Sequence, residues 1–347
     1  MGDILHALPA ITALRDAHPQ WHIGWVVDPR WRGLLTAGSE ETREQATAKA
    51  ERGAAQPLVD QIHLAPVKAW GRRPLTLRTA REIGSLRREL RAGGYDAVLD
   101  LQGAVRSAII ARMAGVQRVI GELHPREGAA RLLFSERIAT HGAHVIEQDI
   151  ELAAAVAGDT LAWVAPRLPI HATAESWCER LLHAHAGQPV VLLTPGAGWG
   201  AKRWPAERYA IVARALAARG MQVLVNCGPG EEPLAQAIQQ ASGGAARPVT
   251  ATLDELIALT RRIALCIGGD TGPLHLACAL GRPVVGIYGP TDPSRNGPYG
   301  TRFTVLRSPS SRRDHTRRAE PEAGLLTITP EEVLGAAQAL LAGENRS

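Results

Sequence analysis

The feature that most constrains the fold is a regular alternation of short apolar runs and amphipathic segments, in which the apolar runs end in glycine-rich loops. In the second half of the chain this pattern predicts strands at 190–194, 222–226, 263–267 and 283–288. It predicts helices at 205–219, 231–242, 252–262, 273–280 and 330–342. Thr252-Leu-Asp-Glu255 has the spacing of a capping box at the start of its helix. Strands that alternate with helices predict parallel sheets with helices on both faces.

The first half of the chain has the same layout with a weaker signal. We predict strands at 21–27, 95–101 and 117–120, and helices at 4–17, 75–92, 104–113 and 144–156. A doubly wound domain opens with a buried strand, whereas this sequence starts in the loop at Gly2-Asp3. Either the start is truncated or misassigned, or the first domain lacks a strand that its sheet would need.

A length of 347 residues suggests two domains, at about 100–200 residues per domain. The stretch 162–175 has two prolines and no clear helical pattern, so we place the domains at 1–165 and 166–347. Residues 37–57 are predicted to be a polar excursion from the first domain. Residues 307–324 are predicted to be a basic loop, and they overlap the stretch 302–318, which has six arginines and one aspartate.

The composition excludes several classes of protein. No apolar run reaches the ~18 residues of a membrane-spanning helix. The four cysteines include no CxxC pair, so neither a zinc site nor a disulfide framework is predicted, and the chain suits a reducing cytoplasm. The net charge is +5, but aromatic residues are 4% of the chain and do not interleave with basic ones. We therefore expect no nucleic-acid partner.

Gly2-Asp3 precedes the first predicted helix, where open α/β sheets place ligands. Asp3 is a candidate proton acceptor or a candidate helix cap, and its position alone favours the cap. His6, one turn further on, is expected to pack within the helix.

The loop Thr194–Pro205 joins a predicted strand to a helix, and its small residues would let backbone N–H groups approach a phosphate. Lys202 supplies positive charge, but the spacing is neither that of a P-loop nor GxGxxG. Two tryptophans, Trp199 and Trp204, flank the Lys-Arg pair. We interpret this loop as a binding site rather than a plain glycine-rich turn.

Three more loops follow predicted strands of the second domain. In Gly268–His275, the N-terminus of the helix is a candidate anion site. Asp270 is a candidate cap of this helix or a candidate binder of a hydroxyl group. His275, in the first turn, faces the same site. Residues 288–293 have ordinary turn chemistry. In 226–232, Glu231 or Glu232 is placed to bind a ribose, although both also suit a helix N-terminus. Together the loops suit a nucleoside diphosphate, and with no DxD pair for a metal, Lys202 and the helix N-termini must balance its charge.

Five segments resemble glycosyltransferase family nine, the ADP-heptose:lipopolysaccharide heptosyltransferases, over nearly the whole chain. They are MGDILHALPAI, YDAVLDLQGAVRSA, AKRWP, GGDTGPLHLA and YGPTDP. Two others, KAWGRRPL and REGAARLLF, resemble most closely the heptosyltransferase I branch. The resemblance implies a GT-B architecture of two Rossmann-like domains, with the acceptor on the first and the donor on the second.

The resemblance also implies an inverting, metal-independent reaction without a cofactor, from ADP-L-glycero-β-D-manno-heptose to Kdo-lipid A. Asp3 would be the general base. The donor residues it implies are Thr194, Lys202, Glu231 or Glu232, Asp270, Thr271, Gly272 and His275. The acceptor residues are Lys68, Arg72, Arg73 and Arg126, of which the first three lie in a basic stretch that also suits a solvated helix face. We expect a monomer in the cytoplasm, peripheral at the inner face of the cytoplasmic membrane.

Three alternatives stay open from the sequence. The chain could be heptosyltransferase II or another family member with a different acceptor. It could be a sugar-nucleotide epimerase of similar architecture, which needs no lipid acceptor. It could also be a regulatory protein that binds a sugar nucleotide without turnover.

Overall fold

The computed structural model describes residues 1–38, 52–183, 185–311 and 319–343. The chain divides into two compact units, the N-terminal one formed by residues 3–170 and the C-terminal one by residues 171–347. The division lies five residues beyond the boundary placed from the sequence. Parts of the predicted polar excursion (39–51) and of the predicted basic loop (312–318) lie outside the described residues.

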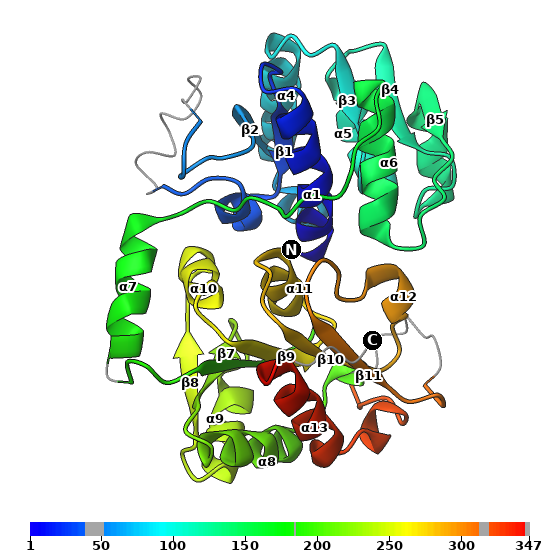
Figure 1. Ribbon diagram of the computed structural model, residues 1–347. Coiled ribbons are helices and arrows are strands. Elements are labelled where there is room, and N and C mark those ends of the chain that lie inside the picture. The colour runs from blue at the N-terminus through cyan, green and yellow to red at the C-terminus, as the bar shows by residue number, and fades with distance from the viewer. Residues whose placement is uncertain (39–51, 184, 312–318, 344–347) are drawn as a thin grey trace. The chain divides into compact units, whose positions relative to one another are not determined.

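The C-terminal unit is built on a six-stranded parallel sheet of order β11-β10-β9-β6-β7-β8 (Figure 1). Its strands are β6 (Val190–Thr194), β7 (Gln222–Cys227), β8 (Ala246–Thr250), β9 (Leu265–Gly269), β10 (Val284–Tyr288) and β11 (Phe303–Arg307). Numbered from β6 as the first strand, this order is 3-2-1-4-5-6, the order of the dinucleotide-binding fold. The chain order reverses between β6 and β9, where such sheets bind ligands beyond the carboxyl ends of the strands.

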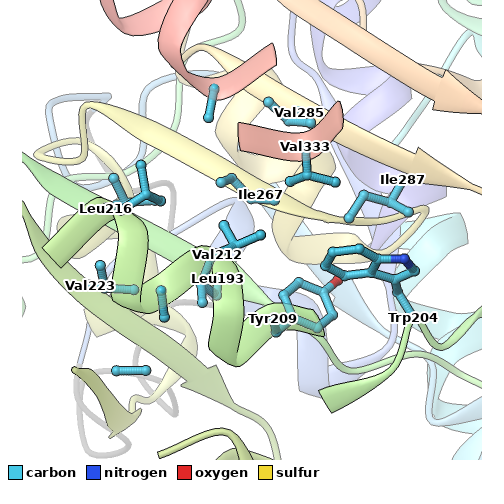
Figure 2. Close-up of a cluster of buried hydrophobic side chains, with 14 of the residues drawn as sticks. Leu193, Trp204, Tyr209, Val212, Leu216, Val223, Ile267, Val285, Ile287 and Val333 are labelled. Carbon is cyan, nitrogen blue, oxygen red and sulfur yellow. The ribbon is translucent and has the colours of Figure 1, made fainter. Parts of the chain in front are cut away.

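The helices of this unit are α7 (Ala172–His183), α8 (Ala206–Ala217), α9 (Glu232–Ala241), α10 (Leu253–Thr260), α11 (Gly272–Ala279), α12 (Pro293–Asn296) and α13 (Pro330–Leu341), with short 3-10 turns η3 (Gly200–Lys202) and η4 (Leu325–Thr327). Helices α8, α9 and α13 pack on one face of the sheet, and α11 contacts β9 and β10. Figure 2 shows the core between the sheet and helices α8 and α13. There Val212 and Leu216 of α8 and Val333 of α13 pack against strand residues such as Leu193 and Ile267. Strands β6, β9 and β10 are buried along their whole length, as expected for parallel strands covered on both faces.

The N-terminal unit has two smaller parallel sheets. Strands β1 (Gly24–Val27) and β2 (Gln61–Leu64) form one, and β3 (Ala97–Leu99), β4 (Arg118–Glu122) and β5 (Glu136–Ile138) form the other, in the order β3-β4-β5. No strand ladder joins the two sheets within the described residues. The helices are α1 (Gly2–Ala17), α3 (Val67–Arg72), α4 (Leu77–Ala92), α5 (Val105–Met113) and α6 (Val145–Ala157), with 3-10 turns η1 (Pro29–Leu34) and η2 (Gly128–Leu133).

Most elements expected from the sequence are present within two or three residues of their predicted ends. The capping box is confirmed: Thr252 Oγ1 accepts from the Glu255 N–H, and the Glu255 carboxylate accepts from the Thr252 N–H. Strands β2, β5, β8 and β11 were not predicted, and helix α7 starts inside the stretch taken as irregular. Pro205 precedes α8 as its N-cap instead of occupying its first turn. Among the residues described, no helix is long and apolar enough to cross a membrane.

Candidate functional site

Lys202, Asp270 and His275 form a largely buried polar cluster at the carboxyl end of the C-terminal sheet. Lys202 ends η3 after β6, Asp270 directly follows β9, and His275 lies in the first turn of α11. Lys202 Nζ donates to Asp270 Oδ2 at 2.5 Å, and His275 Nε2 lies 2.9 Å from Asp270 Oδ1. Because β6 and β9 are neighbours in register, with Thr194 opposite Gly268, their following loops meet at this edge.

The Asp270 carboxyl group is held ionised by its partners. Burial alone would raise its pKa, but the hydrogen bond and charge of His275, together with Lys202, hold the pKa of Asp270 well below its ordinary value. The Lys202 ammonium also lies 4.4 Å from the ring centre of Trp199, a cation–π distance. The cluster therefore holds one lysine ammonium in a fixed place at the edge where the sheet binds ligands.

Helix α11 begins beside this cluster. Thr271 is its N-cap and Gly272 its first residue, so backbone N–H groups of the first turn are open to an anion. Thr271 Oγ1 does not cap the helix; it is buried, and no hydrogen bond to it occurs among the residues that the structure describes. A hydroxyl group in that position is suited to hydrogen bonding with a bound ligand.

The structure separates the two candidate glutamates. Glu231 is the N-cap residue of α9, and its carboxylate accepts from the Gly228 N–H at 3.0 Å. It also lies against Gly196 in the loop after β6, where a Cβ atom would come within 2.0 Å of Glu231 Oε1. Glu232 is exposed on the first turn of α9. Only Glu231 thus reaches the loop that leads to Lys202.

Two residues of the first loop have packing roles. Thr194 is buried, and its hydroxyl group lies against Gly268 of the neighbouring strand. Trp204, one of the two tryptophans that flank the Lys-Arg pair, belongs to the hydrophobic core. Its ring packs edge-to-face on Tyr209 at 4.9 Å, and its Nε1 donates to the Ile328 carbonyl at 3.1 Å (Figure 2).

Residues 319–328 pack behind the loop that carries Lys202. A Cβ atom on Gly200 would come within 1.5 Å of the Ala319 carbonyl oxygen, so the two backbones touch at a place where only glycine fits. The Glu322 N–H donates to the Ala201 carbonyl at 3.1 Å, and Arg208 donates to the carbonyls of Leu326 and Ile328. The loop is thereby held from behind by a segment more than a hundred residues further along the chain.

In the N-terminal unit, Asp3 is exposed on the first turn of α1 and does not cap the helix. Met1 is the N-cap, so the capping interpretation of Asp3 is wrong. Asp3 Oδ2 instead accepts from Gln102 Nε2 at 3.2 Å and lies 3.8 Å from Arg126 Nη1. The predicted base and one predicted acceptor residue therefore lie together, and Gln102 is a neighbour that sequence reasoning missed.

Gln102 is held in place by a buried carboxylate. Asp100, directly after β3, accepts from the N–H groups of Gln102 and Gly103, both at 2.9 Å, and from the Ser107 hydroxyl group. The tight turn after β3 thus aims Gln102 toward Asp3. The only sequence signal for Gln102 was its place in the segment YDAVLDLQGAVRSA.

Lys68, Arg72 and Arg73 are exposed on and directly after α3. No contact joins them to Asp3 within the described residues. No three His, Cys, Asp or Glu side chains in the described part of the chain gather as a metal site would require.

Comparison with known proteins identifies the class. The profile of "Glycosyltransferase family 9 (heptosyltransferase)" matches residues 83–325, more than half of the chain. The chain therefore belongs to glycosyltransferase family 9, and it is an enzyme of the heptosyltransferase type. This finding sets aside the epimerase and the regulatory binder.

Individual relatives agree on the family and differ in the member they name. Lipopolysaccharide heptosyltransferase 1 of Escherichia coli K12 is 28% identical, covering 89% of this chain and 91% of the relative. Lipopolysaccharide heptosyltransferase 3 of Escherichia coli is 26% identical over 98% of this chain and 96% of the relative. The solved structure of E. coli heptosyltransferase WaaC with ADP is similar with a TM-score of 0.75 and 25% identity, covering 98% and 97% of the two chains. This likeness confirms the predicted GT-B fold.

Proposed function

We propose that this enzyme transfers heptose from ADP-L-glycero-β-D-manno-heptose to Kdo-lipid A, an early step in building the lipopolysaccharide inner core. The observation that carries the donor half of this proposal is the Lys202–Asp270–His275 cluster beside the N-terminus of α11. The similar E. coli enzyme with ADP bound supports a nucleotide diphosphate as the ligand. The acceptor half is supported by the basic residues of the N-terminal unit.

Different donor residues bind different parts of the nucleotide. Lys202 and the Thr271-Gly272 start of α11 bind the pyrophosphate, because an ammonium group, a free hydroxyl group and helix N–H groups all favour an anion. Asp270 fixes the position of Lys202. Glu231 binds the ribose hydroxyl groups, because a carboxylate after the second strand of such a sheet is suited to that contact.

Catalysis is a single displacement with inversion at the anomeric carbon. Asp3 takes the proton of an acceptor hydroxyl group while that oxygen forms the new bond to the anomeric carbon. The bond from this carbon to the β-phosphate oxygen breaks, and ADP leaves with the electron pair. Negative charge grows on the diphosphate, so Lys202 and the α11 N-terminus stabilise the transition state more than the bound donor.

The acceptor side depends on positive charge. Arg126 lies beside Asp3, so a carboxylate or phosphate held by Arg126 would bring a sugar hydroxyl group toward the base. Lys68, Arg72 and Arg73, exposed elsewhere on the N-terminal unit, bind the phosphates of lipid A. Gln102 orients the Asp3 carboxylate through its amide.

A product assay tests the proposal. The purified enzyme is incubated with ADP-heptose and Kdo-lipid A, with the same acceptor already carrying one heptose, or with no acceptor. We expect ADP release and a mass gain of one heptose only with Kdo-lipid A. Turnover of the heptosylated acceptor alone would instead assign a later step, as in heptosyltransferase II or III.

Asp3→Asn tests the base in the same assay. The amide keeps the shape of the carboxylate but is a far weaker proton acceptor, so kcat should fall by about a hundredfold or more while ADP affinity is retained. Asp16→Asn is the matched control, since Asp16 is an exposed aspartate on the same helix that pairs with Arg167. Wild-type turnover in Asp3→Asn would remove Asp3 from the reaction.

A further inference from the structure

Helix α4 has an arginine row opposite its buried face. Its inward side chains are Thr79, Ile83, Leu86 and Leu90, which are buried or half-buried. At helical spacing the opposite stripe is Leu77, Arg81, Gly84, Arg88 and Arg91, and all five are exposed. Arg81, Gly84, Arg87, Arg88 and Arg91 line a shallow depression in the surface.

The amino end of this row is apolar and almost fully exposed. Leu75, in the turn before α4, is 99% exposed, and Leu77, at the first position of the helix, is 78% exposed. They are the two most exposed of the large hydrophobic side chains in the described residues. A lone exposed leucine is ordinary, but two that project from one turn next to a row of arginines need a reason.

Charge surrounds these leucines on both sides in the sequence. Residues 66–92 contain eight lysines and arginines and two glutamates, for a net charge of +6, more than the +5 of the whole chain. One of the two glutamates, Glu82, is taken up by a 2.8 Å ion pair with Arg78 and a hydrogen bond from Trp70. The row from Leu77 to Arg91 spans about 21 Å at 1.5 Å per residue.

We propose that Leu75, Leu77, Arg81, Arg88 and Arg91, here called the α4 face, dock the enzyme on an anionic lipid bilayer. The leucines enter the boundary between headgroups and acyl chains, and the arginines bind lipid phosphates. An exposed apolar turn beside a long row of arginines matches an anionic bilayer, in which charged headgroups lie above an apolar interior. No buried polar group lines the depression, so it is not built to hold a single phosphate ion.

The biological role of this docking rests on the proposed function, because docking would bring the enzyme to an acceptor whose acyl chains stay in the membrane. Membrane binding itself is measured without donor, acceptor or turnover. A failure of the α4 face and a failure of the proposed reaction would therefore be seen in separate experiments.

The first experiment places a probe on the leucine turn. All four native cysteines are buried, so Leu75→Cys gives one reactive thiol for an environment-sensitive fluorophore such as NBD. Vesicles of phosphatidylglycerol and phosphatidylethanolamine should shift the emission to the blue, and phosphatidylcholine vesicles should not. Leu132→Cys is the control, because Leu132 is 70% exposed on the same unit but lies outside the α4 face.

The second experiment removes charge while leaving the leucines. Arg88→Gln/Arg91→Gln should lower binding to the anionic vesicles in co-sedimentation by about thirtyfold, since each arginine near such a surface is worth ~1 kcal/mol. Arg106→Gln/Arg112→Gln, which removes two exposed arginines from α5, should bind as wild type. Raising the salt from about 0.05 M to about 0.5 M should weaken the binding strongly, because it screens the part contributed by the arginines.

The third variant removes the apolar part. Leu75→Ser/Leu77→Ser should weaken vesicle binding by about tenfold or more and leave activity on a water-soluble Kdo acceptor unchanged. Circular dichroism melting of each variant confirms that it is folded. An unshifted probe at position 75, equal binding by the two arginine double variants, or full competition by inorganic phosphate would overturn the proposal.

Discussion

The two units each place an aspartate at the end of a parallel strand, Asp100 buried and Asp270 largely buried, and the partners of these two aspartates differ. Asp100 follows β3 in the N-terminal unit, and it is held by two backbone N–H groups and the Ser107 hydroxyl group, all neutral donors. Asp270 follows β9 in the C-terminal unit, and it is held by Lys202 and His275. The same position in the strand-loop-helix motif thus serves a tight turn in one unit and a charged cluster in the other.

The partners decide the direction in which each pKa moves. Burial raises the pKa of Asp100, and its neutral hydrogen bonds only partly offset that effect. Burial also acts on Asp270, but the hydrogen bond and charge of His275 and the charge of Lys202 outweigh it and lower the pKa. A buried carboxylate that is kept ionised beside a lysine marks the site, whereas one with neutral partners only holds a turn.

Replacing Asp270 should have the largest effect on stability. Asp270→Asn leaves the Lys202 ammonium buried without its counter-charge, and breaking such a buried pair costs about 3–5 kcal/mol. Urea unfolding of the variant, followed by circular dichroism, should show that loss in the free energy of unfolding. Donor affinity should fall as well, because Lys202 loses its fixed position.

Asp100→Asn is the matched test of the contrast. Asp100 Oδ1 accepts both backbone N–H groups, so the oxygen of an asparagine can keep them. The free energy of unfolding should therefore change by less than about 1 kcal/mol. Equal losses of unfolding free energy in Asp100→Asn and Asp270→Asn would mean that the two aspartates contribute equally to stability, which would contradict the contrast between them.

Lys202→Ala should weaken ADP binding by about tenfold to a hundredfold, which is the range of a charge-assisted contact of about 1.5–3 kcal/mol. The value of kcat should fall further, since the leaving diphosphate is more charged than the bound donor. Arg203→Ala, an exposed neighbour, serves as the control, and calorimetric ADP titration measures both variants. Equal ADP affinity in the two variants would contradict the role of Lys202.

Glu231→Gln should weaken ADP binding by about tenfold, because an amide is a poorer acceptor for ribose hydroxyl groups than a carboxylate. Glu232→Gln should leave the affinity unchanged, since Glu232 is exposed and only Glu231 lies against Gly196. ADP titration by fluorescence can compare the two variants. The opposite ranking would show that the ribose lies over the first turn of α9 and not over Gly196.

The pH dependence of the free energy of unfolding should distinguish the contribution of Asp100 from that of Asp270, although this is the smallest effect expected. The contribution of Asp270 is present above its ordinary pKa of about 4 and is lost only as the pH falls through its lowered pKa. The contribution of Asp100 is fully present below about pH 4 and is lost as the pH rises through its raised pKa. From pH 7 to about pH 4, wild type should therefore gain stability relative to Asp100→Asn, and its advantage over Asp270→Asn should stay constant. If the stability difference between wild type and Asp100→Asn changed with pH in the same way as that between wild type and Asp270→Asn, the contrast between the two aspartates would be contradicted.

The sequence predicted the central strands of the C-terminal sheet because continuous buried runs such as Val190–Thr194 leave a clear signal. It missed β8 and β11, which lie at the two edges of the sheet and mix apolar residues with arginine, and β8 also contains Pro248. Edge strands tolerate proline and need little apolar surface, so no periodic pattern marks them.

The candidate site was predictable only in part. Lys202, Asp270 and His275 were singled out from their loops, and the structure brings them together. The choice between Glu231 and Glu232 depends on a contact with Gly196, 35 residues earlier, which adjacent residues in a sequence cannot reveal. Gln102 was missed because a lone glutamine in a turn has no spacing signature.

The contact of Gly200 with Ala319 has a consequence for the newly made chain. The loop that carries Lys202 is synthesised early in the C-terminal unit, but the backbone that supports it from behind comes more than a hundred residues later. At about 5–20 residues per second, several seconds separate the two events on the ribosome. The support of this loop is therefore complete only when β11 and the segment after it have emerged. We expect a chain stalled before that point to form the centre of the sheet without a supported Lys202 loop.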